Sequence, residues 1–125
     1  MKLFTVEEAN SLLPSVRSIV RSIQSAYRRL VSCESAAKEA AEGAKYGGGG
    51  MAEGARYAQL VIELSLCVGE LESLGVQLKD YARGLIDFPS MRDDRVILLC
   101  WQLGEGDAIE WWHETEAGFA GRQPL

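Results

Sequence analysis

The last third of the chain decides the fold: residues 84–125 read GLIDFPSMRDDRVILLCWQLGEGDAIEWWHETEAGFAGRQPL. This stretch contains all three tryptophans, the only histidine and two of the three prolines. Its residue pattern predicts three short strands joined by short turns, with strands at 85–88, 96–102 and 108–113. Such strands form an antiparallel meander, and the glycine-rich end at 118–125 is predicted to be irregular.

Before residue 84 the hydrophobic periodicity is helical. Apolar residues spaced alternately four and three apart predict a first helix over 5–45, through Val16, Val20, Ile23, Tyr27 and Leu30. Thr5 and Glu8 have the spacing of a capping box at its start. Pro14 predicts one of two outcomes, a break with a restart or a kink in one helix.

A second helix is predicted over 55–83, because the same rhythm continues through Tyr57, Val61, Leu64, Val68, Leu71 and Leu78. Between the helices, residues 46–54 include four consecutive glycines and are predicted to form a loop. The expected fold is a single α+β domain over 1–125. It consists of a long antiparallel helical hairpin, coiled-coil-like, followed by a small three-stranded antiparallel β-meander.

Composition narrows the class of protein. The chain has 125 residues, 47% of them hydrophobic, and a net charge of -5, which is typical of one globular domain. The net negative charge disfavours nucleic-acid binding, and only the arginines between Arg17 and Arg29 favour it. The first residues lack the apolar core of a signal peptide, and no apolar run approaches membrane-span length, so we expect a cytoplasmic protein without membrane contact. Three cysteines without CxxC spacing indicate reduced thiols.

Acidic residues gather near the single histidine. Five carboxylates and no lysine or arginine lie between Gly104 and Gly118. Carboxylates with one imidazole predict a divalent metal site, formed by Asp87, Glu105, His113 and Glu114. No spacing matches a known metal motif, so the alternative is a solvated acidic surface with a structural histidine.

Three other residues are candidates for contact with a ligand or an anion: Arg122, Trp101 and Trp112. The alternatives are that the tryptophans belong to the core and that Arg122 pins the tail to a carboxylate. Trp111 and Trp112 are adjacent in a strand and therefore face opposite ways, so one of them needs a cover other than the core. Cys100 is expected to be an inert buried thiol, although His113 on the next strand could serve it as a base.

Several phrases together resemble the bacterial family known as domain of unknown function 2203. They are Phe4-Thr5-x-Glu7-Glu8-Ala9-Asn10-x-Leu12-Leu13-Pro14, Lys79-Asp80, Gly84-Leu85-Ile86-Asp87-Phe88-Pro89, Leu99-Cys100-Trp101, Gly104-Glu105, Trp112-His113 and Gly118-Phe119-x-Gly121-Arg122-x-Pro124. The resemblance covers essentially the whole chain. It implies a small bacterial cytoplasmic protein and no particular activity.

Two functions are compatible with these observations. The first is a non-enzymatic interaction module that self-associates as a homodimer through its helices and presents the sheet to an unknown protein partner. The second is a protein that binds a divalent metal or a small ligand, with hydrolysis as a compatible activity, and with its site in the C-terminal region of acidic residues, histidine and tryptophan.

Overall fold

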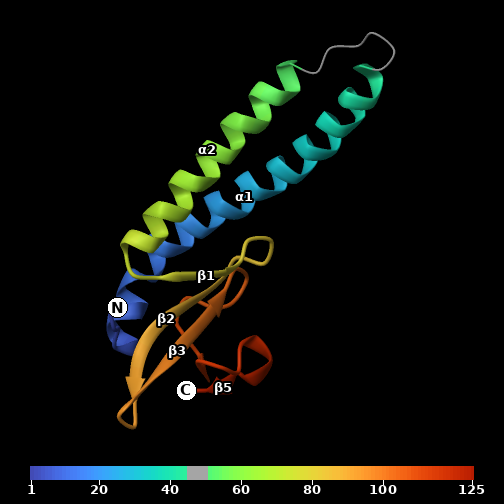
Figure 1. Ribbon diagram of the computed structural model, residues 1–125. Helices are drawn as coiled ribbons and strands as arrows, with labels where there is room; N and C mark the ends of the chain where they lie inside the picture. Colours follow the sequence, from blue (N-terminus) through green and yellow to red (C-terminus); the bar gives the residue numbers. More distant parts are fainter. Residues whose placement is uncertain (45–50) are drawn as a thin grey trace.

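The computed structural model describes residues 1–44 and 51–125 and consists of a helical hairpin beside an antiparallel sheet (Figure 1). The helices are α1 (Val6–Ala44) and α2 (Met51–Ser73). The strands are β1 (Gln77–Asp80), β2 (Leu85–Arg92), β3 (Arg95–Gln102), β4 (Trp111–Glu114) and β5 (Gln123–Pro124), with the short 3-10 helix η1 (Phe119–Gly121) before β5. Their spatial order follows the chain, and each neighbouring pair is antiparallel. The predicted α+β fold is therefore confirmed, but the sheet has five strands and not three.

Helix α1 begins at the predicted capping box. The Thr5 amide donates to the Glu8 carboxylate at 3.1 Å, and the Glu8 amide donates to the Thr5 hydroxyl at 3.0 Å. The helix then continues through Pro14, so the predicted alternative of a break with a restart is wrong. Leu13 and Val16 on either side are fully buried, and their packing offsets the hydrogen bond that the proline cannot donate.

Helix α2 ends ten residues before the predicted boundary at 83, because Gly75 terminates it. Gly75 has a φ of 88°, its amide donates to the Glu72 carbonyl at 2.9 Å, and the Val76 amide donates to the Leu71 carbonyl at 3.4 Å. These two bonds with a left-handed glycine form a Schellman motif. The chain then turns into β1, which contains Leu78. At its other end α2 begins at Met51, inside the predicted loop over 46–54, whose first five residues lie outside the described residues.

We expect Gly75→Ala to destabilise the protein by about 1–2 kcal/mol, because a left-handed φ is costly for any residue with a Cβ. The new Cβ would also lie 2.9 Å from Cβ of Lys2. Gly69→Ala is the matched control in the same helix. A Cβ at position 69 would meet nothing within 4 Å, so we expect Gly69→Ala to raise the free energy of unfolding by about 1 kcal/mol through its higher helix propensity. Urea unfolding followed by circular dichroism measures both, and a gain in the Gly75 variant would contradict this account of the helix end.

The sheet extends beyond the predicted strands at both of its edges, and at one edge β1 takes residues 77–80 from the predicted second helix. Strand β2 passes through Pro89, which was expected to stop it. The Pro89 carbonyl accepts from the Phe4 amide at 2.7 Å, so the backbone of Pro89 faces away from β3 and its missing N–H costs no bond in that ladder. At the other edge the tail, expected to be irregular, adds β5 to β4 through the pairs Trp111 with Pro124 and Trp112 with Gln123.

The two faces of the sheet have different partners. Residues of one face pack against buried residues of the helices, among them Val16, Val20 and Leu71, and these strand residues are Ile86, Phe88, Ile97, Leu99, Trp101 and Trp112. We call this the inner face. The alternate residues form the outer face, on which Leu85, Leu98 and Cys100 are also buried. Within the two described segments, neither helix combines the length and apolar character that a membrane span requires.

Candidate functional site

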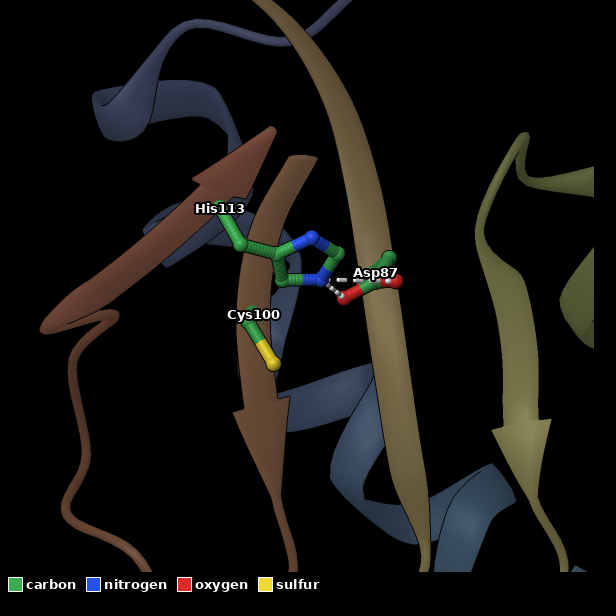
Figure 2. A group of neighbouring side chains, drawn as sticks. All are labelled: Asp87, Cys100 and His113. Atoms are coloured by element: carbon green, nitrogen blue, oxygen red, sulfur yellow. Dashed lines mark hydrogen bonds and ion pairs between the residues drawn. The ribbon is translucent and has the colours of Figure 1, made fainter. Parts of the chain in front are cut away.

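Three side chains with metal-binding atoms meet on the outer face of the sheet: Asp87 from β2, Cys100 from β3 and His113 from β4 (Figure 2). Asp87 lies directly opposite Cys100 in the ladder between β2 and β3. His113 lies opposite Leu98, two residues before Cys100, and therefore shares their face. One potential ligand atom from each of the three lies within 4.8 Å of the other two. The meander thus brings an oxygen, a sulfur and a nitrogen donor together; we call this set the Asp-Cys-His cluster.

Hydrogen bonds fix the orientation of the His113 ring. Nδ1 lies 2.7 Å from the backbone carbonyl oxygen of Glu114, and a carbonyl only accepts, so Nδ1 carries a hydrogen. Nε2 points at Asp87, 3.1 Å from Oδ1 and 3.2 Å from Oδ2. With Nδ1 already protonated, a neutral ring would direct the Nε2 lone pair at carboxylate lone pairs. A positive centre, either one proton or a metal ion, must therefore lie in this contact.

The cluster is almost completely shielded from solvent. Asp87 and His113 are each 2% exposed and Cys100 is 1% exposed. Burial, and after it the negative charge of Asp87, raises the pKa of the Cys100 thiol to about 12. Without a metal the sulfur is therefore a neutral thiol at physiological pH. This disfavours Cys100 as a ready nucleophile, because the thiolate is the reactive form.

The other two predicted metal ligands lie in ion pairs. The two carboxylate oxygens of Glu105 accept hydrogen bonds from Nη2 of Arg122 at 2.6 and 2.9 Å. The Glu114 side chain forms an ion pair with Arg95, and the hydrogen bonds from Arg95 lower the pKa of Glu114. Glu114 lies opposite Ile97 in the ladder, so its side chain is on the inner face of the sheet. Of the predicted set, the structure therefore brings together Asp87 and His113 and separates Glu105 and Glu114 from them. Glu114 still contributes its backbone carbonyl to His113.

The predicted ligand-contact residues lie on different faces. Trp101 and Trp112 are buried on the inner face, and the Trp101 indole N–H donates to the Gly106 carbonyl at 2.9 Å. Arg122 lies on the outer face, where its guanidinium is 5.1 Å from the centre of the Trp111 ring. The three residues therefore do not line one common pocket.

Sequence reasoning did not include Cys100 among the candidate metal ligands. The signal that places it is strand parity: if Trp101 belongs to the core, Cys100 must face the other way. That parity puts Cys100 on the outer face. Its alignment with Asp87 depends on the register of the hairpin between β2 and β3, which the two-residue turn sets. Asp93 and Asp94 form this turn with φ values of 50° and 61°.

The fold and the cluster define an α+β protein with a helical hairpin, a five-stranded meander and a buried set of potential metal ligands. The chain belongs to the family described as uncharacterized conserved protein (DUF2203), whose model matches residues 2–125. Comparison with curated proteins and with solved structures gives no match.

Proposed function

We propose that the protein binds a divalent transition-metal ion of the Zn²⁺ class at the Asp-Cys-His cluster. The observation that carries the proposal is the convergence of three different ligand types within 4.8 Å, from three separate strands. Two donor atoms on a tetrahedral Zn²⁺ ion lie about 3.3 Å apart, given metal–ligand bonds of about 2.0 Å. The separations of 3.1 and 3.2 Å between Nε2 of His113 and the Asp87 oxygens are close to that value.

The surroundings of His113 support the same proposal. Histidines that bind a metal through one ring nitrogen usually donate the other N–H to a carboxylate, a carbonyl or water. His113 has this arrangement, because Nδ1–H donates to the Glu114 carbonyl and leaves Nε2 directed into the cluster.

Charge balance also supports a dication. A divalent ion would replace the proton between His113 and Asp87 and the proton of the Cys100 thiol. The carboxylate and the thiolate then neutralise the two positive charges, which matters because an uncompensated charge at such burial is costly. A bound metal deprotonates its thiol ligand, so the high pKa of free Cys100 does not oppose this step.

The donor set indicates the kind of ion and the kind of role. One thiolate, one imidazole and one carboxylate suit Zn²⁺, Co²⁺ or Fe²⁺ better than Mg²⁺ or Ca²⁺, which prefer oxygen ligands. The burial of all three side chains favours binding of an ion over catalysis on a larger substrate. A reduced Cys100 is required, so we place the protein in a reducing compartment such as the cytoplasm.

Titration of the metal-free protein with Co²⁺ tests this function. We expect one ion to bind per chain, with a thiolate-to-cobalt charge-transfer absorption, and Zn²⁺ to displace it. Cys100→Ser should abolish the charge-transfer band, and His113→Asn should weaken binding at least tenfold. Cys67→Ser is the matched control, since this half-buried thiol lies on α2 away from the cluster. Absence of cobalt binding, or a charge-transfer band that survives Cys100→Ser, would rule the site out.

A second candidate function is self-association of two copies through α2. Helix α2 has a stripe of uncharged residues along its solvent-exposed side. The residues are spaced three and four apart: Ala55, Ala58, Ile62, Leu66, Gly69 and Ser73. All six are exposed, and Ile62 and Leu66 are 61% and 71% exposed. A second copy of α2 packed antiparallel across Leu66 would cover the stripe.

Sedimentation equilibrium tests the dimer. We expect the natural chain to sediment as a dimer and Leu66→Glu as a monomer, because the new charge would be buried between two copies. Met91→Glu is the control, since Met91 is also an exposed apolar residue but lies at the far end of β2. A monomeric natural chain at high concentration would remove this candidate.

A further inference from the structure

The C-terminal segment after β4, residues 115–125, lies beside the strands and away from the helical hairpin (Figure 1). A turn from Glu114 to Ala117 and a left-handed Gly118, with a φ of 65°, redirect the chain into η1. Strand β5 then returns along β4. The segment therefore folds back toward the outer face of the sheet, which carries the Asp-Cys-His cluster.

One residue makes most of the specific contacts of this segment. Nη2 of Arg122 forms the ion pair with Glu105 and reaches the backbone carbonyl of Cys100 at 3.4 Å. Its guanidinium is also 4.7 Å from the centre of the Phe119 ring and 5.1 Å from that of Trp111. Arg122 thus connects the tail to the strand residue that supplies the sulfur of the cluster.

Apart from Arg122, the segment has few specific contacts within the described chain, and its one other side-chain contact of this kind is that of the Phe119 ring, whose centre lies 4.0 Å from the Arg83 guanidinium. No residue of η1 is buried, and Gln123, Pro124 and Leu125 are exposed. Strand β5 contributes only two residue pairs, and the Leu125 amide adds one bond to the Glu110 carbonyl. Segments with few buried apolar contacts open at low free-energy cost. Loss of the Arg122 contacts would therefore release the tail before it released the sheet.

We propose that residues 115–125 are a strap that controls entry and exit of the metal ion, and that the ion pair of Arg122 with Glu105 is its latch. This inference rests on the proposed metal site. The three ligands are almost fully buried, so an ion reaches them only if a covering segment moves. The tail contacts the backbone carbonyl of Cys100 through Arg122, and few bonds hold the rest of it.

The rate of Zn²⁺ transfer to an excess of a chromogenic chelator tests the strap. We expect Arg122→Gln and Glu105→Gln each to speed Zn²⁺ release at least about tenfold, because each removes a charge-assisted contact. The double variant should release no faster than either single variant, since both break the same latch. Zn²⁺ loading should accelerate to a similar extent, so that the dissociation constant changes much less than the rates. Arg29→Gln is the control, because it removes a comparable ion pair, with Glu63, on the hairpin.

The outcomes separate the two proposals. If the natural chain binds no Zn²⁺, the metal site fails and the strap fails with it. If Zn²⁺ binds but both latch variants release it at the natural rate, the metal site stands and the strap is overturned. A third outcome is that a variant releases Zn²⁺ faster, loads it at the natural rate and binds it correspondingly more weakly. This would show that Arg122 only stabilises the metal site, which also overturns the strap. Circular dichroism of each variant checks that it is folded.

Discussion

Replacing Asp87 with alanine should lower the free energy of unfolding of the metal-free protein by about 3–5 kcal/mol, the usual cost of removing one partner from a buried charged pair. Asp87 and His113 are each 2% exposed, and Nε2 of His113 has no other described hydrogen-bond partner. The loss leaves that nitrogen buried without a partner and creates a small cavity between β2 and β4. Urea unfolding in the presence of a chelator measures the change.

Two variants make this prediction specific. Asp107→Ala also removes an aspartate from an ion pair, in this case with Arg17 at 2.9 Å, but the Asp107 side chain is 95% exposed. A surface ion pair of this kind contributes about 0–1 kcal/mol. Asp87→Asn keeps the shape and lets the new amide donate to Nε2 of a neutral His113, so it should cost clearly less than Asp87→Ala. Equal losses for Asp87→Ala and Asp107→Ala would contradict the buried contact.

The sequence predicts those parts of the fold that local patterns determine. The capping box of Thr5 and Glu8, the buried seam of α1 and the antiparallel order of β2, β3 and β4 are all local features, and each is present. The prediction for α2 was wrong because the apolar spacing continues from Leu71 to Leu78 across its true end. The conformation of Gly75 outweighs that periodicity, since a left-handed residue with two capping bonds ends a helix whatever follows it.

Long-range pairing explains the other differences. Two residues are too few to give β5 a strand pattern, and it forms only because β4 offers it an edge. The candidate site divides in the same way. Residue types placed Asp87 and His113 among the candidate metal ligands. The sequence also offered an ion pair between Arg122 and a carboxylate, but it could not show that the partner is Glu105 or that Arg95 pairs with Glu114. Cys100 could be recognised only once the register had set it opposite Asp87.

Trp101→Ala is expected to destabilise the protein by about 3–5 kcal/mol, the usual cost of removing a large aromatic side chain from a core. Trp101 is 1% exposed on the inner face, where it packs with buried residues of α1 and the sheet. Its indole N–H donates to the Gly106 carbonyl at 2.9 Å, and the Arg17 guanidinium lies 5.6 Å from the ring centre. The residue therefore links β3, the loop after it and the first half of α1. Equilibrium unfolding in urea gives the magnitude.

Conservative replacement separates the role of the ring from that of its hydrogen bond. Trp101→Phe keeps most of the apolar volume but removes the shorter of the two hydrogen bonds to the Gly106 carbonyl and leaves only that from Nη2 of Arg17 at 3.5 Å, so we expect a loss of about 1–2 kcal/mol. Trp111→Ala is the comparison on the outer face, where the indole is only half-buried, and its loss should be smaller than that of Trp101→Ala. If Trp101 were mainly a ligand contact, Trp101→Ala would leave the unfolding free energy close to that of the natural chain. A large loss would instead place Trp101 in the core that holds β3, and with it Cys100, against α1.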